Sequence, residues 1–370
     1  MSNNPIGVCV VGYGYWSPKL IRNIQENPKL TLIAICEKDL SRHDRIRGEQ
    51  PNIEILQHYR DAFSRDDIHA VVIATIPSSH YRIAKMALEQ GKHVLVEKPL
   101  TLSVDEGAEL LRLSEKKGLV LMVDHTFLYN PAIQILTNLV RKGELGKINS
   151  IESVRVNLGL FQRDTNVVWD LAPHDFSILL SLISERPTHV SVIGSKTVIH
   201  PKQVQAQESV AHIMLHYSSG LIAHVHVSWI SPTKVRQLTV IGSDKVAVFD
   251  QLAENQLMVY DQGVYPNEEE GESGPLFIYK TGDPYSIEYD RSGEDLARMI
   301  LDFANSISTK GAPTSSSRLG LEVVALLQAS DRSMQKGGTK TPVKYRNTHS
   351  SRNWDYLHFL KNMILSILGK

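Results

Sequence analysis

A β-branched run near the start of the chain, Ile6–Val11, leads directly into a glycine-rich turn and then into a helical pattern. The run has no helical period, which indicates a buried strand. Gly12 permits a tight turn after this strand, and Gly14 lets a pyrophosphate approach the backbone, whereas Ser17 replaces the third glycine of the dinucleotide fingerprint. Ser17 and Pro18 together predict the N-cap and first residue of a helix, whose free N–H groups would face phosphate.

The alternation of apolar strand and amphipathic helix continues to about residue 125. Further strands are expected at Leu30–Cys36, Ala70–Thr75, Val94–Val96 and Leu119–Val123. This alternation is typical of an α/β doubly wound parallel sheet, in which ligands bind at the carboxyl ends of the strands. The candidate cofactor contacts therefore lie in the turns that follow strands, and they are Gly12, Gly14, Tyr15, Trp16, Glu37, Lys38, Thr75, Pro77, His80, Glu97 and Lys98.

Glu37 ends the second strand and follows Gly12 by 25 residues, close to the spacing of a ribose-binding acid. A carboxylate there accepts the adenosine ribose hydroxyls and repels a 2′-phosphate, which predicts NAD. Lys38 and Arg42 follow and would suit a phosphate, so NADP is the alternative. A solvated strand-end residue is the alternative for Glu37 itself. His80 is compatible with a cofactor contact or with a surface residue that starts a helix.

Lys98 follows the apolar run Val94–Val96 and precedes Pro99. At the carboxyl end of a buried strand its ammonium would lie in a crevice, where it can donate a hydrogen bond to a substrate hydroxyl. Pro99 fixes the chain direction after the strand and biases Lys98 toward an extended conformation. A surface lysine in a turn is the alternative, because Lys-Pro is a common turn dipeptide.

Three segments carry a family resemblance, GYGYW at 12–16, EKP at 97–99 and DHTFLYNP at 124–131. They resemble the glucose–fructose oxidoreductase/inositol dehydrogenase family, and the similarity extends to about residue 345. The resemblance implies a Rossmann domain, residues 1–125, and an α+β domain with a large, mainly antiparallel open sheet, residues 126–346. Residues 347–370 lie beyond it and form the predicted C-terminal helical extension. In the family, the lysine of EKP is catalytic or orients the substrate, and it matches Lys98.

A second candidate site lies in WDLAPHD, where Asp170 and His174 are four residues apart and share a face on helical geometry. With a lysine nearby such a pair can perform acid–base chemistry. The alternative is an N-cap aspartate with a core or surface histidine. The family resemblance supports the catalytic interpretation, because its members have an aspartate and a histidine at this spacing that face the nicotinamide. Pro173, inside the motif, departs from the family's smoother helices.

From Thr188 to about Asp250 apolar residues alternate with period two, which predicts antiparallel strands. Four histidines fall on the polar phase of two adjacent strands: His212, His216, His224 and His226. Imidazoles on one sheet face can converge on a metal, but no cysteine or carboxylate joins them in these strands, so we predict no metal. The family pairs this open face with another subunit, which predicts a homodimer or homotetramer.

Composition excludes several classes of protein. Lysine plus arginine and aspartate plus glutamate both number 40, which argues against a nucleic-acid surface. No apolar run is long enough to span a membrane, and the N-terminus lacks the pattern of a signal peptide. The two cysteines, Cys9 and Cys36, fall in predicted strands and imply no disulfide framework, as in a reducing, cytoplasmic compartment. The apolar tail Trp354–Leu368 suggests docking within an oligomer or, alternatively, a membrane-surface helix.

These observations predict an NAD-dependent oxidoreductase that oxidises a sugar hydroxyl to a ketone. Lys98 would hold the hydroxyl, His174 would take its proton, and Asp170 would orient the sugar, although Lys98 and His174 can exchange roles. GYGYWSP, FLYNP and WDLAPHD look most like enzymes that oxidise UDP-N-acetylglucosamine at C3 ahead of a transaminase, in amino-sugar or surface-polysaccharide biosynthesis. The alternatives are a polyol or inositol dehydrogenase, and a sugar- or dinucleotide-sensing regulator without catalysis.

Overall fold

The computed structural model describes residues 4–162, 164–198, 207–266 and 276–346. They form two compact units. The first contains the described residues up to 129 with 293–325 and 345–346, and the second contains the described residues of 130–292 with 326–344. The domain boundaries predicted from the sequence stay predictions, and the extension 347–370 lies outside the described residues.

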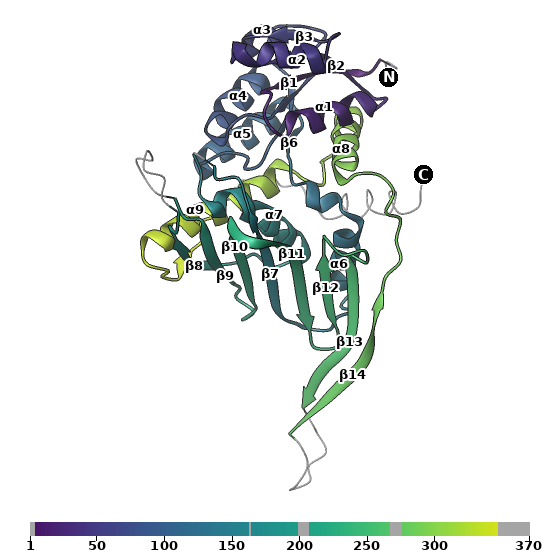
Figure 1. The fold of residues 1–370 in the computed structure, drawn as a ribbon, viewed down its shortest axis with the longest axis vertical. Coiled ribbons are helices and arrows are strands. Elements are labelled where there is room, and N and C mark those ends of the chain that lie inside the picture. Colours follow the sequence, from purple (N-terminus) through teal and green to yellow (C-terminus); the bar gives the residue numbers. More distant parts are fainter. Residues whose placement is uncertain (1–3, 163, 199–206, 267–275, 347–370) are drawn as a thin grey trace. The chain divides into compact units, whose positions relative to one another are not determined.

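The first unit is built on a six-stranded parallel sheet in the order β3-β2-β1-β4-β5-β6 (Figure 1). Its strands are β1 (Ile6–Val11), β2 (Leu30–Cys36), β3 (Glu54–Leu56), β4 (Ala70–Ile73), β5 (His93–Val96) and β6 (Leu121–Val123). Its helices are α1 (Ser17–Glu26), α2 (His43–Glu49), α3 (Tyr59–Phe63), α4 (Pro77–Glu89), α5 (Val104–Lys117) and α8 (Asp295–Thr309), with the 3-10 turns η1 (Leu40–Arg42) and η2 (Thr126–Tyr129). The strand order reverses beside β1, which is where doubly wound sheets bind ligands.

Local sequence signals explain why these elements begin and end where they do. Strands β1 and β2 have the predicted bounds, since both are apolar runs that are buried almost throughout. Their free thiols, Cys9 and Cys36, are core residues with the sulfur atoms 3.4 Å apart. Helix α5 is capped by the Ser103 hydroxyl, which accepts a hydrogen bond from the Asp105 N–H, and it ends at Gly118 in the left-handed region.

The free edge of β6 is covered by a segment from far along the chain. The Val123 N–H donates to the Ser315 carbonyl at 3.1 Å, and the Ser315 hydroxyl donates to the Val123 carbonyl at 2.6 Å. The Tyr129 hydroxyl donates to the Asp302 carboxylate of α8 at 2.7 Å. Residues 293–325 are therefore part of the fold of the first unit.

The second unit is built on a nine-stranded sheet in the order β14-β13-β12-β11-β7-β10-β9-β8-β15. The strands are β7 (Ile148–Leu158), β8 (His189–Ser195), β9 (Val210–His216), β10 (Ile222–Ser228), β11 (Ile230–Gly242), β12 (Val246–Asp250), β13 (Leu257–Pro266), β14 (Phe277–Ser286) and β15 (Thr341–Pro342). All pairs are antiparallel except β10 with β7. Helices α6 (Pro131–Arg141) and α7 (Val167–Leu182) contact this sheet, and α9 (Ser317–Gln335) begins in the first unit and ends in the second. The predicted fold class is confirmed.

A buried ion pair joins α7 to β7. The Arg155 guanidinium contacts the Asp175 carboxylate at 2.8 Å, and both side chains are only 4% exposed. The Ser153 hydroxyl donates to the same carboxylate at 2.8 Å. Ser153 and Arg155 alternate with outward-facing positions of β7, so they belong to its helix-covered face. The Asp175 carboxylate therefore has a structural role, because its contacts join α7 to β7 inside the second unit.

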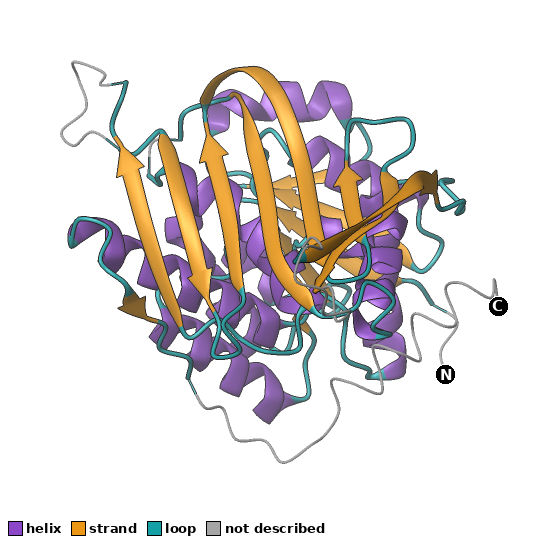
Figure 2. Cartoon of the chain, turned by 90° about the horizontal axis from the view of Figure 1, so that it is seen from below, coloured by secondary structure: helices purple, strands orange, loops and turns teal. Residues whose placement is uncertain are grey.

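The opposite face of the nine-stranded sheet carries a row of histidines (Figure 2 shows the broad sheet). The ring of His212 stacks on that of His226, with centroids 4.3 Å apart and planes at 12°, and also on that of His224 at 5.6 Å. His216 lies apart and contacts the Ser191 hydroxyl. Among the described residues no group of three or more histidine, cysteine, aspartate or glutamate side chains could hold a metal. The metal-free and oligomer predictions for this face stay predictions.

The length and hydropathy of the helices show whether any of them could span a membrane. Within the described ranges, no helix is both long enough and apolar enough to cross a bilayer. The predicted cytoplasmic location stays a prediction, and the tail Trp354–Leu368 lies outside the described residues.

Candidate cofactor and substrate site

The turn after β1 has the conformation that its glycines allow. Gly12 has φ of +96°, and a Cβ there would lie 2.6 Å from the Ala74 carbonyl oxygen, so no larger residue fits. At Gly14 a Cβ would meet only that oxygen at 3.8 Å, an ordinary contact. The protein therefore requires glycine at position 12, whereas at position 14 it leaves open space above the backbone, as a pyrophosphate would need.

The predicted helix cap at Ser17 is wrong. Helix α1 has Trp16 at its N-cap, with no side-chain capping bond, and Ser17 is the first helical residue. The buried Ser17 hydroxyl instead accepts a hydrogen bond from the Gly14 N–H at 3.0 Å and donates to the Gly12 carbonyl at 2.9 Å. The residue that replaces the third glycine of the fingerprint thus bridges the backbone of Gly12 and Gly14 through its hydroxyl and stabilises the turn.

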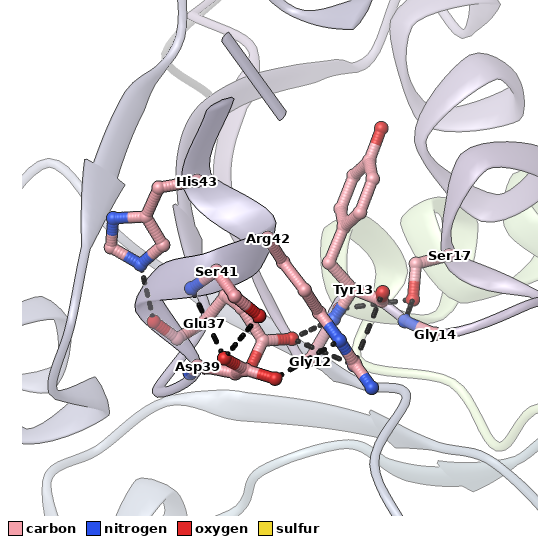
Figure 3. A network of polar contacts seen from close by, with 9 residues as sticks. All are labelled: Gly12, Tyr13, Gly14, Ser17, Glu37, Asp39, Ser41, Arg42 and His43. Carbon is pink, nitrogen blue, oxygen red and sulfur yellow. Dashed lines mark hydrogen bonds and ion pairs between the residues drawn. The ribbon is translucent and has the colours of Figure 1, made fainter. Parts of the chain in front are cut away.

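Glu37 is buried beside this turn, which rules out the solvated alternative (Figure 3). Its carboxylate accepts hydrogen bonds from the backbone N–H of Tyr13 at 2.8 Å and of Asp39 at 2.9 Å. The Arg42 guanidinium contacts Glu37 at 3.3 Å and Asp39 at 3.6 Å. Sequence spacing predicted Glu37 next to the glycine turn but not its ion pair with Arg42.

The other residues predicted around the turn are exposed. Tyr15 is 71% and Trp16 48% exposed, and their rings pack edge to face with centroids 5.7 Å apart. The Lys19 ammonium lies 4.3 Å from the Trp16 ring centroid, a cation–π contact. Lys38 is exposed as well. Exposed aromatic rings beside a glycine turn are available to a ligand, and their cofactor role stays a prediction.

His80 supports the turn that follows β4. It is fully buried, which excludes the surface alternative, and α4 begins at Pro77 rather than at His80. Its ring nitrogens lie 2.8 Å from the Pro99 carbonyl oxygen and 3.0 Å from that of Thr75. The imidazole therefore links the segments after β4 and β5, and its predicted contact with the cofactor stays a prediction.

The ends of β5 and β6 place further polar side chains at the same edge of the sheet. Glu97 and Lys98 follow β5, and Lys98 precedes Pro99 through a cis peptide bond. Asp124 follows β6 and donates its N–H to the Val96 carbonyl at 2.8 Å. The sequence predicted no role for Asp124. The signal that identified Lys98, a polar residue at the end of a buried strand, would also have identified Asp124.

In the second unit, α7 presents Asp170 and His174 together. From Val167 to Leu179 these two are the only part-exposed positions of an otherwise buried helix, as the shared face predicts. Asn166 caps the helix with bonds to two backbone N–H groups, so the N-cap alternative for Asp170 is wrong. The helix continues through Pro173.

The Asp170 carboxylate is held by a residue that the sequence did not single out. The indole N–H of Trp229, which is 1% exposed, donates to the Asp170 carboxylate at 2.9 Å. The first unit carries Lys98 and the second carries Asp170 and His174. That the three side chains act on one substrate stays a prediction.

Comparison with known proteins establishes the family. Residues 6–125 match the model of an oxidoreductase family with an NAD-binding Rossmann fold, and residues 133–248 match the GFO/IDH/MocA C-terminal domain. The uncharacterized oxidoreductase YdgJ of Escherichia coli (strain K12) is 31% identical over 250 residues, which are 60% of this chain and 71% of that protein. The chain therefore belongs to the Gfo/Idh/MocA family of oxidoreductases. The predictions of an oxidoreductase and of NAD are confirmed at the level of this family.

Other relatives match over shorter stretches. UDP-N-acetylglucosamine 3-dehydrogenase of Acidithiobacillus ferrooxidans is 29% identical over 200 residues, 53% of this chain and 60% of that enzyme. The uncharacterized oxidoreductase sll0816 of Synechocystis is 31% identical over 41% of either chain. Both are thus covered over less than two thirds of their length. A solved structure of the A. ferrooxidans enzyme superposes with a TM-score of 0.74 at 22% identity, covering 91% of this chain and all of that one, which shows a shared fold.

The two glycines of the turn lead to opposite expectations. A Gly14→Ala variant should fold normally, because its methyl group meets no protein atom closer than 3.8 Å. Its dissociation constant for NADH should rise about tenfold or more, because the methyl occupies the space of the pyrophosphate, a cost of about 1.4 kcal/mol or more. Fluorescence titration with NADH measures this effect. Gly12→Ala is the matched contrast and should lower the melting temperature; unchanged NADH affinity in Gly14→Ala would contradict the assignment.

Proposed function

We propose that this protein oxidises a secondary hydroxyl of a sugar to a ketone, with NAD as the hydride acceptor. The observation that carries the proposal is the edge of the parallel sheet, where the glycine turn, the buried Glu37 carboxylate and Lys98 all follow strand ends. When bound, the nicotinamide ring supplies the acceptor for the hydride. Side chains of this protein would bind the substrate, take the proton of its hydroxyl and stabilise charge on the oxygen.

The residues of the turn fit the cofactor. The space above Gly14 and the amino end of α1 suit the pyrophosphate, and Glu37 would accept the hydroxyls of the adenosine ribose. A carboxylate at that position repels a 2′-phosphate, which favours NAD over NADP. Tyr15 and Trp16 would cover the bound dinucleotide, since their rings are exposed at the same turn.

Oxidation of the hydroxyl also requires a proton acceptor and a means of stabilising charge on the oxygen. We assign the proton to His174 and the hydrogen bond to the hydroxyl oxygen to Lys98. Asp170 would accept a hydrogen bond from a neighbouring sugar hydroxyl, and the Trp229 indole N–H fixes its carboxylate for that task. The reverse assignment, with Lys98 as base, stays open to the kinetic comparison described below.

We further propose a nucleotide sugar as substrate, with oxidation of UDP-N-acetylglucosamine at C3. Support comes from the motifs GYGYWSP, FLYNP and WDLAPHD and from the 29% identity to a dehydrogenase of that name. The alternatives are a polyol such as inositol, and a sensor that binds dinucleotide without turnover. A sensor needs no proton acceptor, and the pair of part-exposed residues Asp170 and His174 on α7 favours catalysis.

One assay separates these functions. The full chain is mixed with NAD or NADP and with UDP-N-acetylglucosamine, UDP-glucose, N-acetylglucosamine or inositol, and the absorbance of reduced cofactor is followed. We expect reduction of NAD with UDP-N-acetylglucosamine and a product ketone at C3 by NMR. Activity on inositol alone would favour the polyol dehydrogenase. Tight binding of NADH without turnover of any sugar would favour the sensor.

A further inference from the structure

The ends of β5 and β6 bring two carboxyl groups together next to Lys98. Val96 pairs with Val123 in the sheet, so Glu97 and Asp124 are the first residues beyond the paired strands. Their carboxyl groups lie within hydrogen-bonding reach of each other. A hydrogen bond between them requires one of the two groups to carry a proton, because two ionised carboxylates offer no hydrogen.

The hydrogen-bond donors around the pair identify the group that carries the negative charge. The Asp124 carboxylate accepts hydrogen bonds from both the backbone N–H and the hydroxyl of Thr126. Glu97 accepts one, from the backbone N–H of Lys98. Because donors stabilise the ionised form, the larger number at Asp124 indicates that Asp124 is the carboxylate and Glu97 the acid.

The surroundings favour the same assignment. Asp124 is only 7% exposed, and burial together with the negative charge of Asp124 raises the pKa of Glu97 well above its usual range. Burial also raises the pKa of Asp124, but its bonds from Thr126 and Glu97 oppose that shift. These contacts favour the proton on Glu97 rather than on Asp124.

Lys98 acts electrostatically on both members of the pair, and its positive charge lowers the pKa of each carboxyl. His125 is fully buried, and among the described residues its ring nitrogens have no hydrogen-bond partner; burial, and then the charge of Lys98, lower its pKa to about 3, so it is neutral. On α8, which contacts η2, Asp302 is bonded to Tyr129.

We propose that Glu97 and Asp124 form an acid–carboxylate pair that shares one proton, and that its single negative charge positions the Lys98 ammonium toward the substrate hydroxyl. Lys98 is the catalytic residue, and the pair acts through it. The positioning role rests on the proposed function, whereas the shared proton does not. Glu97, assigned above only to the cofactor, thereby gains a second role as a neutral hydrogen-bond donor.

Infrared spectroscopy tests the shared proton without any substrate. Protein labelled with carbon-13 at the side-chain carboxyl of glutamate should show, at neutral pH, the carbonyl band of a protonated carboxylic acid at the isotope-shifted position. The band should be absent from the Glu97→Gln variant. A band that is absent from the native protein, or that persists in Glu97→Gln, would overturn the proposal, and this result holds whether or not a sugar is oxidised.

The positioning role is tested by unequal kinetic effects of two isosteric variants. Asp124→Asn removes the charge of the pair and should lower kcat about 100-fold and shift the pH–rate profile, whereas Glu97→Gln keeps a donor and the charge of the pair, so its loss in kcat should be about tenfold or more smaller than that of Asp124→Asn. Thr126→Val should fall between them. Asp61→Asn, at an exposed position, is the matched control. The opposite ranking of Glu97→Gln and Asp124→Asn would overturn the positioning role, while no turnover of any sugar by the native protein would count against the proposed function alone.

Discussion

Replacing Lys98 by methionine is expected to lower turnover by about 10³-fold or more while NADH binding stays within a few-fold of native. Methionine keeps much of the length of the side chain but removes the ammonium that donates to the reacting oxygen. The oxygen then gains negative charge with no donor to stabilise it. Steady-state kinetics with the substrate found in the assay above, and fluorescence titration with NADH, measure the two quantities.

The companion variant His174→Ala decides which residue is the base. If His174 takes the proton, the variant should lose about 10²-fold or more, and a small primary amine or imidazole added to the solution should restore part of the rate. If Lys98 is the base, His174→Ala should keep the larger residual rate of the two variants. Lys116→Met, at an exposed position on α5, is the control for the substitution itself. Near-normal turnover in both Lys98→Met and His174→Ala would refute the site.

The largest effect on stability is expected from Asp175→Ala. The substitution removes the Asp175 carboxylate from the Arg155 guanidinium, which is only 4% exposed, and breaking such a buried ion pair costs about 3–5 kcal/mol of unfolding free energy. Urea unfolding followed by circular dichroism measures the loss in the transition that reports the second unit. The reason lies in desolvation, since a buried cation loses its hydration whether or not a carboxylate replaces it.

Two further variants test this explanation. Replacing both residues, Arg155→Met with Asp175→Leu, should restore most of the lost stability, because the buried guanidinium is then removed together with the carboxylate that it contacts. Asp44→Ala removes the partner of Arg47 in an exposed pair on α2 and should change stability by less than about 1 kcal/mol. An Asp175→Ala protein as stable as the native one would show that Arg155 reaches solvent.

The fold could be predicted from the sequence because its signals are local. The bounds of β1, β2 and β7 follow from apolar runs or from strict alternation, and the ends of α5 follow from Ser103 and Gly118. Each of these signals acts through the backbone within a few residues. Tertiary contacts do not need to be known to interpret them.

The residues that the sequence analysis misinterpreted or missed at the site have one feature in common. Their hydrogen-bond partners lie on other segments or differ from the partner that the local sequence suggests. By sequence the Ser17 hydroxyl could cap the helix, but in the structure it forms hydrogen bonds with the backbone of Gly12 and Gly14 instead. His80 bonds to carbonyl groups on two segments, and Asp170 is held by Trp229 from 59 residues away. No local pattern encodes such partners, whereas the position of Lys98 at a strand end does not depend on them.

The segment that covers β6 has a consequence for biosynthesis. When the ribosome has released the residues of the six parallel strands, Ser315 has not yet been made, and the amides of Val123 at the sheet edge face water or whatever nascent strand is near. Residues 130–292, which belong to the second unit, must be made before Ser315 can cover this edge of the first. A fragment that stops after Tyr129 lacks that closure, and this favours chaperone capture or edge-to-edge association during synthesis.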